Sequence, residues 1–288
     1  MDPTQGRVPA TTIDVHVDRR TVLPGRVWCA ENPRGLVAIC HGLGEHSGRY
    51  AALASDLAAA RFSVVCLDLP GHGQTNGPRG DMPSWIAVRD HAVPAMFTAL
   101  RGIPGQPAEL PHVLLGNSMG GLLALDYGLA HPGTLHGVVV SGAAIKNAMP
   151  PWWKLALANV ARVTTPAAPF PHGLDEGGVS RDPEVLRSRK ADPLMGYVIS
   201  PRLYFAMQEA QSRVMREARQ LAVPTLLLHG AADRLTDPKG SLEFNAAAPH
   251  GKSRLITYKD AYHDLFTDTI RDQVVKDVAG WLELVAVM

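Results

Sequence analysis

The five residues from Gly116 to Gly120 constrain the fold of this chain more than any other stretch. They read Gly-Asn-Ser-Met-Gly, directly after the apolar run Val113–Leu115 and ahead of the helix-like run Leu122–Leu125. A strand, a sharp turn and a helix are the context in which G-x-S-x-G forms a nucleophile elbow. A Cβ at either glycine would collide with the neighbouring strand and helix. The pattern therefore predicts that Ser118 stands on a strained turn, placed to attack a carbonyl.

Strand-like and helix-like segments alternate along the chain, which is typical of a mainly parallel sheet covered by helices on both faces. The expected strands are Ile13–Val17, Arg26–Ala30, Leu36–Cys40, Ser63–Leu67, Val113–Leu115, Gly137–Val140, Val223–His229 and Arg254–Tyr258. Expected helices include Arg49–Ala60, Trp85–Leu100 and Gln273–Val287. Pro94 should kink or interrupt the second of these helices, because proline lacks the N–H that a helix interior needs. The sequence predicts an α/β fold.

One interval breaks this alternation. Roughly eighty residues separate the strand that ends near Ser141 from the strand that starts at Val223, and ordinary connections are far shorter. Several prolines punctuate the interval, with helical pieces at Trp152–Val163 and Leu203–Gln220. We interpret residues 146–221 as a helical cap inserted over the carboxyl edge of the sheet, before the acid-bearing strand. Residues 1–145 and 222–288 would then form the core.

A serine hydroxyl needs a histidine to take its proton and a carboxylate to orient that histidine. In a fold of this kind the order along the chain is serine, acid, histidine. Asp233 follows a buried strand and a glycine turn, so we expect it to be the acid. Asp237 precedes Pro238 and is expected to cap the next helix instead.

The candidate base is His263, which lies in the loop after the last expected strand. His229 and His250 are the competing histidines. His229 precedes the acid, on the wrong side for the expected order, and His250 precedes the final strand. We therefore expect His263 to act as the base.

Backbone N–H groups should stabilise the oxyanion of a tetrahedral intermediate. One donor is expected at Met119, directly after the nucleophile. The second should come from the loop after an earlier strand, here His41–Gly44, where Leu43 is the best candidate. The next turn, around His72, is expected to serve only as a scaffold.

Composition narrows the function classes. The chain has 288 residues, a net charge of +1 and 46% hydrophobic residues, which suits a globular enzyme and gives no sign of a nucleic-acid partner. The start lacks a signal-peptide pattern, and no apolar run reaches the ~18 residues of a membrane span. Cys29, Cys40 and Cys66 are expected to be buried free thiols in a reducing cytoplasm. Neither a metal-ligand spacing nor a phosphate loop is present, so we expect no metal and no cofactor.

Together these motifs resemble the monoacylglycerol lipase family, from about residue 10 to the end. The matching motifs are His41–Tyr50, Gly71–Gln74, Gly77–Gly80, Ser118–Gly121, Ser180–Pro183, Ala191–Leu194, Leu228–Leu235 and Ala261–His263. The ten-residue segment that contains the oxyanion loop is highly specific, whereas many hydrolases share the elbow. The resemblance implies an α/β-hydrolase fold with a cap, no cofactor, and hydrolysis of monoacylglycerols to glycerol and fatty acid. It carries over the roles of the following residues: Ser118, Asp233, His263, Leu43 and Met119.

The chain departs from this family at Asn117, where the family usually has histidine. An Asn-Ser-Met-Gly-Gly elbow is similar to that of carbon–carbon hydrolases acting on ring-cleavage products. A carbon–carbon hydrolase, a general carboxylesterase, an acyltransferase and a non-catalytic ligand-binding protein therefore remain as alternatives. The candidate substrate contacts are Glu45, Arg49, Asn117, Lys146, Trp152, Trp153 and Thr236.

The tryptophan pair Trp152 and Trp153 lies in an apolar stretch with one lysine. Three interpretations stand: transient docking on membranes or micelles, packing inward against the sheet, or lining an acyl tunnel. The expected location is cytoplasmic, with peripheral membrane association in the first case.

Overall fold

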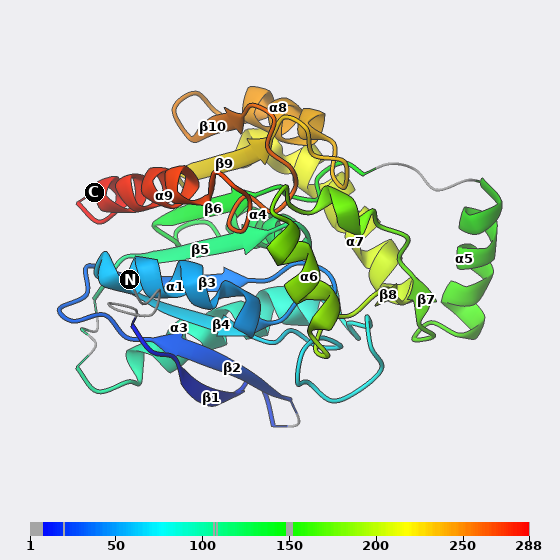
Figure 1. The fold of residues 1–288 in the computed structure, drawn as a ribbon, viewed down its shortest axis with the longest axis horizontal. Coiled ribbons are helices and arrows are strands. Elements are labelled where there is room, and N and C mark those ends of the chain that lie inside the picture. Colours follow the sequence, from blue (N-terminus) through cyan, green and yellow to red (C-terminus); the bar gives the residue numbers. More distant parts are fainter. Residues whose placement is uncertain (1–7, 20, 106, 108, 148–151, 288) are drawn as a thin grey trace.

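The computed structural model describes residues 8–19, 21–105, 107, 109–147 and 152–287. Within these residues, eight strands form one sheet in the order β1-β2-β4-β3-β5-β6-β9-β10 (Figure 1). The strands are β1 (Thr11–His16), β2 (Val22–Trp28), β3 (Gly35–Cys40), β4 (Phe62–Leu67), β5 (His112–Asn117), β6 (Gly137–Ser141), β9 (Thr225–Gly230) and β10 (Ser253–Tyr258). Strand β2 is antiparallel to both of its neighbours, and β4, β3, β5, β6, β9 and β10 are parallel to one another. The predicted mainly parallel sheet is confirmed.

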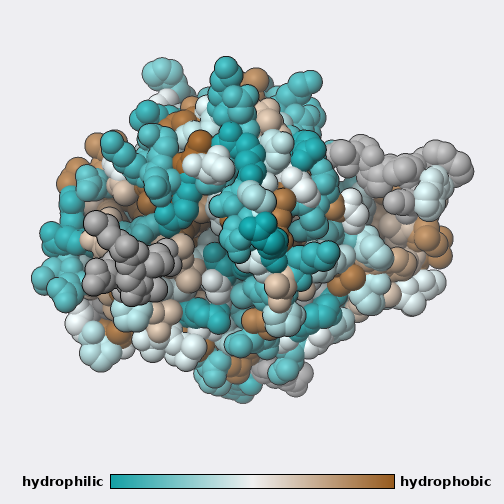
Figure 2. Space-filling model, in the orientation of Figure 1, coloured by the Kyte–Doolittle hydropathy of each residue, from teal (hydrophilic) through white to brown (hydrophobic). Residues whose placement is uncertain are grey.

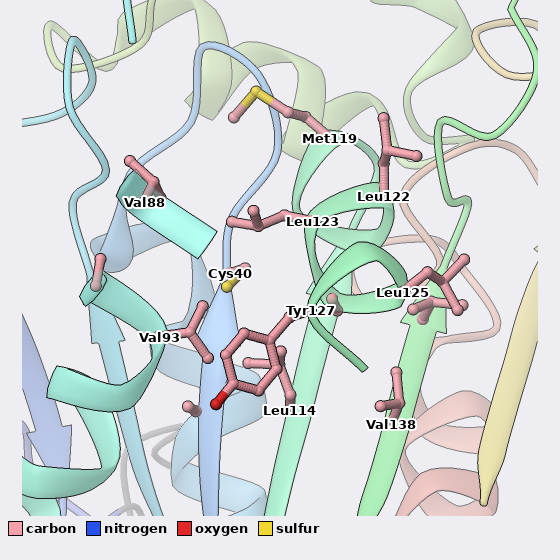
Figure 3. Close-up of a cluster of buried hydrophobic side chains, with 14 of the residues drawn as sticks. Cys40, Val88, Val93, Leu114, Met119, Leu122, Leu123, Leu125, Tyr127 and Val138 are labelled. Atoms are coloured by element: carbon pink, nitrogen blue, oxygen red, sulfur yellow. The ribbon is translucent and has the colours of Figure 1, made fainter. Parts of the chain in front are cut away.

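Helices cover both faces of the sheet, which is why the central strands read as unbroken apolar runs. Successive residues of β3 alternate between the two faces: Val37 and Ile39 pack in one core cluster, and Leu36 and Ala38 in the other. The first cluster lies under η1 (Ser47–Tyr50), α1 (Ala51–Ala59) and α9 (Arg271–Val285). The second lies under α2 (Trp85–Ala87), η2 (Val88–Ala92), α3 (Val93–Arg101), α4 (Met119–Ala130) and α8 (Pro238–Ala247). Figure 3 shows the second cluster around α4.

The segment expected as a helix at Trp85–Leu100 is helical throughout, but its hydrogen-bond pattern changes just before Pro94. Its middle turn, η2, is a π-helix that ends directly before α3, in which Pro94 stands in the first turn. The Pro94 ring would clash with the carbonyl of Asp90 in a regular α-helix. A wider π turn accommodates the proline without breaking the segment.

The interval between β6 and β9 has two structurally different parts. It contains α5 (Trp152–Thr164), β7 (Phe170–Pro171), η3 (Glu176–Gly178), α6 (Pro183–Ala191), β8 (Val198–Ile199), α7 (Pro201–Glu217) and η4 (Ala218–Gln220). Helix α7 packs on α4, and its residues Leu203, Ala210 and Val214 belong to the core. Helix α5 instead stands out from the body of the protein (Figure 1).

A buried carboxylate joins α7 to the core. Asp126, on α4, accepts hydrogen bonds from Nε and Nη2 of Arg213 at 2.7 and 2.6 Å. It also accepts one from Nε1 of Trp85 at 2.8 Å. The Asp126 side chain thus ties together α2, α4 and α7.

The expectation of three buried thiols is wrong for Cys29. Cys40 and Cys66 are buried, but Cys29 is exposed. Strand β2 ends at Trp28, two residues before the predicted end, so Cys29 lies outside the covered strand. Among the described residues, no helix has the length and apolar character needed to cross a membrane.

Alanine substitutions at Gly120 and Gly280 are expected to change stability in opposite directions. A Cβ at position 120 would lie 1.9 Å from the Cys40 carbonyl oxygen, so Gly120→Ala should cost about 1–3 kcal/mol or more. Gly280 is exposed within α9, and an added Cβ would meet nothing within 4 Å. Gly280→Ala should therefore stabilise by about 0.5–1 kcal/mol. Urea unfolding measures both changes, and a neutral Gly120→Ala would contradict the close approach of α4 to β3.

Candidate active site

Ser118 occupies the strained turn predicted between β5 and α4. Its φ is 56° and its ψ is −116°, a conformation that costs a non-glycine residue about 1–3 kcal/mol. The Ser118 N–H donates to the Ser141 carbonyl at 2.9 Å, and the Ser118 carbonyl accepts from the Ala144 N–H at 3.0 Å. A Cβ on Gly116 would lie 2.1 Å from the Gly120 carbonyl oxygen. The end of β6 and the flanking glycines therefore hold the turn in place.

Asp233 lies just beyond the carboxyl end of β9, and its carboxylate is fully engaged. Oδ1 accepts the backbone N–H groups of Leu235 and Thr236 at 2.8 and 3.1 Å. Oδ2 lies 2.8 Å from the Thr236 hydroxyl, 2.8 Å from His263 Nδ1 and 3.1 Å from His229 Nε2. Thr236, predicted as a substrate contact, is buried among the groups that hold the acid.

His263 reaches the acid from the loop after β10. A Cβ on Gly142 would lie 3.1 Å from His263 Nδ1, so the imidazole packs directly on Gly142. The preceding residue, Ser141, accepts a hydrogen bond from the Ser118 N–H through its carbonyl oxygen. The ends of β6 and β9 therefore connect the Ser118 backbone, through Ser141 and Gly142, to the His263–Asp233 pair. Along the sequence, these three residues are 115 and 30 residues apart.

The charges in this group favour an ionised acid and a basic imidazole. Burial raises the pKa of Asp233, but the hydrogen bonds from His229 and His263 outweigh it and hold the pKa well below its usual range. Burial lowers the pKa of His263, but the hydrogen bond and charge of Asp233 outweigh it, so the net pKa is raised. Such a pair can accept a proton from a nearby hydroxyl and keep the resulting imidazolium beside a carboxylate.

The loop after β3 is folded by its own glutamate. Oε2 of Glu45 accepts the Gly42 N–H at 3.0 Å, and the Glu45 N–H donates to the Gly42 carbonyl at 3.2 Å. Leu43 lies in the middle of this turn, and a Cβ on Gly42 would lie 3.4 Å from Ser118 Cβ. Met119 opens α4, where backbone N–H groups have no carbonyl partner within the helix. Both predicted oxyanion donors thus belong to segments next to the serine.

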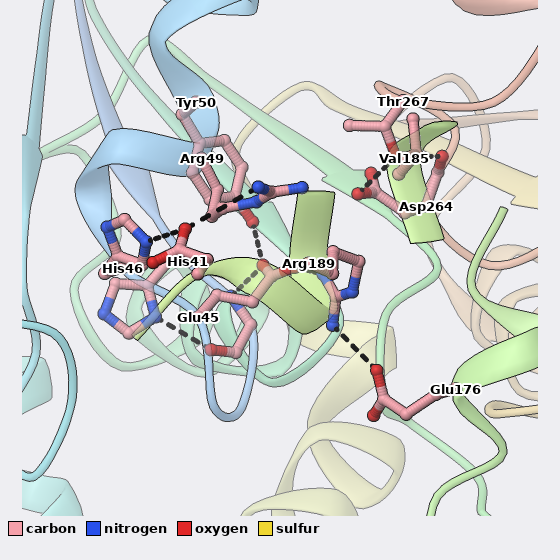
Figure 4. Close-up of polar contacts among 12 residues, drawn as sticks. His41, Glu45, His46, Arg49, Tyr50, Glu176, Val185, Arg189, Asp264 and Thr267 are labelled. Carbon is pink, nitrogen blue, oxygen red and sulfur yellow. Dashed lines mark hydrogen bonds and ion pairs between the residues drawn. The ribbon is translucent and has the colours of Figure 1, made fainter. Parts of the chain in front are cut away.

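Glu45 also anchors the segment around α6 (Figure 4). Its Oε1 accepts from Arg189 Nη1 at 2.7 Å, and its Oε2 accepts from the Tyr50 hydroxyl at 2.6 Å. Burial raises the pKa of Glu45, but the charge of Arg189 and these hydrogen bonds leave it below its usual value. Protein groups therefore occupy both oxygens of a residue predicted as a substrate contact.

Further bonds join the same two segments. His46 Nε2 lies 2.9 Å from Asp192 Oδ2, and Arg49 Nη1 lies 3.7 Å from the same oxygen. The Gly196 N–H donates to the Gly44 carbonyl at 2.7 Å. Sequence reasoning did not assign roles to Arg189 or Asp192, although the resemblance included the motif that contains Asp192.

The remaining predicted residues are spread around this centre. Asn117 is buried at the end of β5. Lys146 is exposed and pairs with Glu243 at 2.8 Å. Trp153 is 53% exposed on α5. The Trp152 side chain lies outside the described residues, as do Met149, Pro150 and Pro151.

Asp237 and His72, which were predicted to have structural roles, both contact backbone groups of their own segments. Asp237 caps α8 by accepting the Lys239 N–H at 2.9 Å. His72 Nδ1 lies 2.9 Å from the Pro70 carbonyl, and burial lowers the pKa of His72 to about 3.

A cavity of about 300 Å³ lies beside the candidate site, between η1, α6 and the loop after His263. Its polar lining includes Glu45, Arg49 and Asp264, but not Ser118 or Asp233. Within the described ranges, we find no cluster of three or more histidine, cysteine or acidic side chains that could hold a metal ion.

Comparison with known proteins agrees with this geometry. A family model described as serine aminopeptidase, S33, matches residues 31–270. A monoacylglycerol lipase from Mycolicibacterium smegmatis is 33% identical over 89% of this chain and 91% of its own length. Human monoglyceride lipase is 32% identical over 87% of this chain and 82% of its own length.

Solved structures extend the likeness to the fold. The monoacylglycerol lipase of Paleococcus ferrophilus matches with a TM-score of 0.82 and 32% identity, covering 90% of this chain and 98% of its own. A soluble variant of monoglyceride lipase from Saccharomyces cerevisiae, in complex with a substrate analog, has a TM-score of 0.86 over 98% of both chains at 21% identity. The chain belongs to the monoacylglycerol lipase family, within the α/β-hydrolases that the serine aminopeptidase S33 model describes.

Proposed function

We propose that this chain hydrolyses monoacylglycerols to fatty acid and glycerol through an acyl-enzyme on Ser118. The observation that carries the proposal is the His263–Asp233 pair. The His263 ring packs on Gly142 at the end of β6, and the neighbouring Ser141 carbonyl accepts the N–H of Ser118 in its strained turn. Relatives that span most of the chain are monoacylglycerol lipases. That argues against the carbon–carbon hydrolase suggested by Asn117, and a general carboxylesterase is the main alternative.

The proposed reaction has two displacements. Ser118 Oγ attacks the ester carbonyl while His263 takes the hydroxyl proton, and Asp233 stays ionised beside the imidazolium. The N–H groups of Leu43 and Met119 stabilise the oxyanion. As the intermediate collapses, His263 gives its proton to the glycerol oxygen and glycerol leaves. Water, activated by the same histidine, then releases the fatty acid and restores Ser118.

Residues 146–221 are proposed to form a cap over this site in two parts. The part around α6 is fixed to the loop after β3 by the Arg189–Glu45 pair. Arg49 lies 3.7 Å from Asp192, just after α6, and also lines the neighbouring cavity. We place the glycerol moiety on that polar side. The acyl chain would lie under the less tightly attached part that contains α5.

Helix α5 is proposed to contact membranes or micelles. Its exposed residues Trp153, Leu157, Val160 and Val163 follow one another at intervals of four, three and three residues, which places them along one side of a helix. The opposite side packs toward α7, where the Arg162 guanidinium lies 4.7 Å from the Phe205 ring centre. Figure 2 shows hydrophobic side chains on this protruding part. Exposed Trp153 argues against inward packing of both tryptophans.

Ser118→Ala is expected to reduce hydrolysis of 1-monooleoylglycerol by about 10⁵–10⁶-fold, because the nucleophile is lost and only binding and the oxyanion donors remain. Glycerol release measures this. Wild type should also act on 1-monocapryloylglycerol, and p-nitrophenyl butyrate serves as the general ester. Serine-dependent activity on the butyrate alone would make the protein a general esterase, and no serine-dependent activity at all would contradict the mechanism.

The acid limb of kcat/KM is expected to lie above the pH of about 6.5 at which an ordinary histidine titrates. His263 must be neutral to accept the Ser118 proton, and the net effect of its surroundings raises its pKa. Activity should thus be present above that raised pKa and be lost as the pH falls through it. A pH profile with p-nitrophenyl butyrate checks this. An acid limb below pH 6 would show that another group controls the rate.

The double substitution Leu157→Ser/Val160→Ser is expected to lower the vesicle-bound fraction of the protein by at least about tenfold, because each apolar side chain that enters a bilayer interface contributes about 1 kcal/mol or more. Cosedimentation with phosphatidylcholine vesicles containing 1-monooleoylglycerol measures the fraction. Leu242→Ser is the matched control, since Leu242 is 58% exposed but lies on α8. Equal binding of both variants would contradict docking through α5.

A further inference from the structure

The acid of the candidate triad has a second imidazole partner that the proposed reaction does not use. His229, near the end of β9, is 1% exposed. Its Nε2 lies 3.1 Å from Asp233 Oδ2, the same oxygen that contacts His263 Nδ1 at 2.8 Å. Two histidines from different parts of the chain thus converge on one carboxylate oxygen.

The hydrogen-bond partners of His229 define its tautomer. Asp233 is ionised, so its Oδ2 accepts, and Nε2 of His229 must carry a hydrogen to make a favourable contact. In the tautomer with its hydrogen on Nε2, Nδ1 carries the lone pair. Nδ1 lies 2.7 Å from the Ser241 hydroxyl of α8, which can donate to it. In this arrangement the Ser241 hydroxyl donates to His229 Nδ1, and His229 Nε2–H donates to Asp233 Oδ2.

We propose that His229 is a positioning residue for the acid, with Ser241 fixing the tautomer that lets it donate. This inference rests on the proposed roles of Asp233 and His263. An additional donor holds the Asp233 carboxylate at a fixed rotation. It also withdraws negative charge from the oxygen that faces His263. His229 therefore restrains how strongly the acid raises the basicity of the catalytic imidazole.

Other groups around these two histidines have separate effects. Asp264 and Glu45 act on His263 through their negative charges. The Thr236 hydroxyl lies 3.3 Å from both His229 Nε2 and His263 Nδ1. Asp264, Glu45 and the Thr236 hydroxyl keep their contacts when Ser241 is replaced, whereas replacing His229 also removes one partner of that hydroxyl. Comparing His229→Leu with His229→Gln and Ser241→Ala therefore isolates the effect of the His229 contact.

The test compares His229→Leu, His229→Gln and Ser241→Ala with wild type in pH profiles of p-nitrophenyl butyrate hydrolysis. In His229→Leu, the freed carboxylate should raise the pKa of His263, moving the acid limb upward by roughly half a unit to one unit. The kcat should fall about tenfold, comparable with the loss of an outer-shell partner behind a metal-bound histidine. His229→Gln keeps an N–H donor and should restore the wild-type limb. Ser241→Ala should shift it partly, in the same direction.

An unchanged acid limb in His229→Leu, or an equal shift in His229→Gln, would overturn the proposal. Should His229→Leu fail to fold, Ser241→Ala decides alone, because it leaves the imidazole in place, and an unshifted limb overturns the proposal. Asp233→Asn tests the proposed triad independently of the positioning role of His229. It should lose about 10⁴-fold in kcat. Full activity in Asp233→Asn would refute the triad, whereas an inactive Asp233→Asn with an unshifted His229→Leu would refute only the role of His229.

Discussion

The candidate site depends on the backbone of one turn at the end of β6. Ser141 accepts the N–H of Ser118, and Gly142 both packs against the His263 ring and donates its N–H to Leu228 of β9. The Gly142 carbonyl accepts the Thr236 hydroxyl at 3.1 Å. Because these bonds are short and local, the serine, the histidine and the acid are located relative to one backbone segment that carries none of them.

The sequence allowed prediction of those parts of the site that lie at strand ends. In a parallel sheet, residues that follow buried strands meet at the carboxyl edge, so Ser118, Asp233 and His263 could be inferred one by one from their positions. The elbow turn was predictable for the same reason, with glycines at each flank. These features follow from local patterns, namely an apolar run and the residues immediately after it.

Features that depend on pairing between distant segments were not predictable. Glu45 and Arg189 are 144 residues apart, and neither residue's neighbours indicate its partner. His229 was excluded as the base by chain order, which does not reveal that its ring returns to Asp233 from within β9. Cys29 was expected to be buried because its neighbours are apolar, but its exposure depends on where β2 ends, and strand ends are poorly defined by composition.

The two parts of the segment between β6 and β9 differ in how firmly buried ion pairs attach them to the core. Side chains of the Arg189–Glu45 pair are 7% and 6% exposed, and removing one partner of a buried pair leaves an uncompensated charge that costs about 3–5 kcal/mol. This buried pair therefore couples the region around α6 to the loop that contains Leu43. Exposed α5 has no comparable buried pair among the described contacts, so α5 is not coupled in this way to the loop that contains Leu43.

The hydrogen bonds that Asp126 accepts from Trp85 and Arg213 limit how much of this fold can be removed to make a smaller protein. Excising residues 146–221 would remove Arg213, whose guanidinium supplies two of the hydrogen bonds to a carboxylate that is 1% exposed. In the shortened chain, the Asp126 carboxylate on α4, the helix that follows Ser118, would keep only Trp85 Nε1 at 2.8 Å and Arg89 Nη1 at 3.5 Å of the partners described for it. A derivative that keeps α7 retains both Arg213 hydrogen bonds to Asp126, so the structure favours a truncation point after α6 and not at the edge of the sheet.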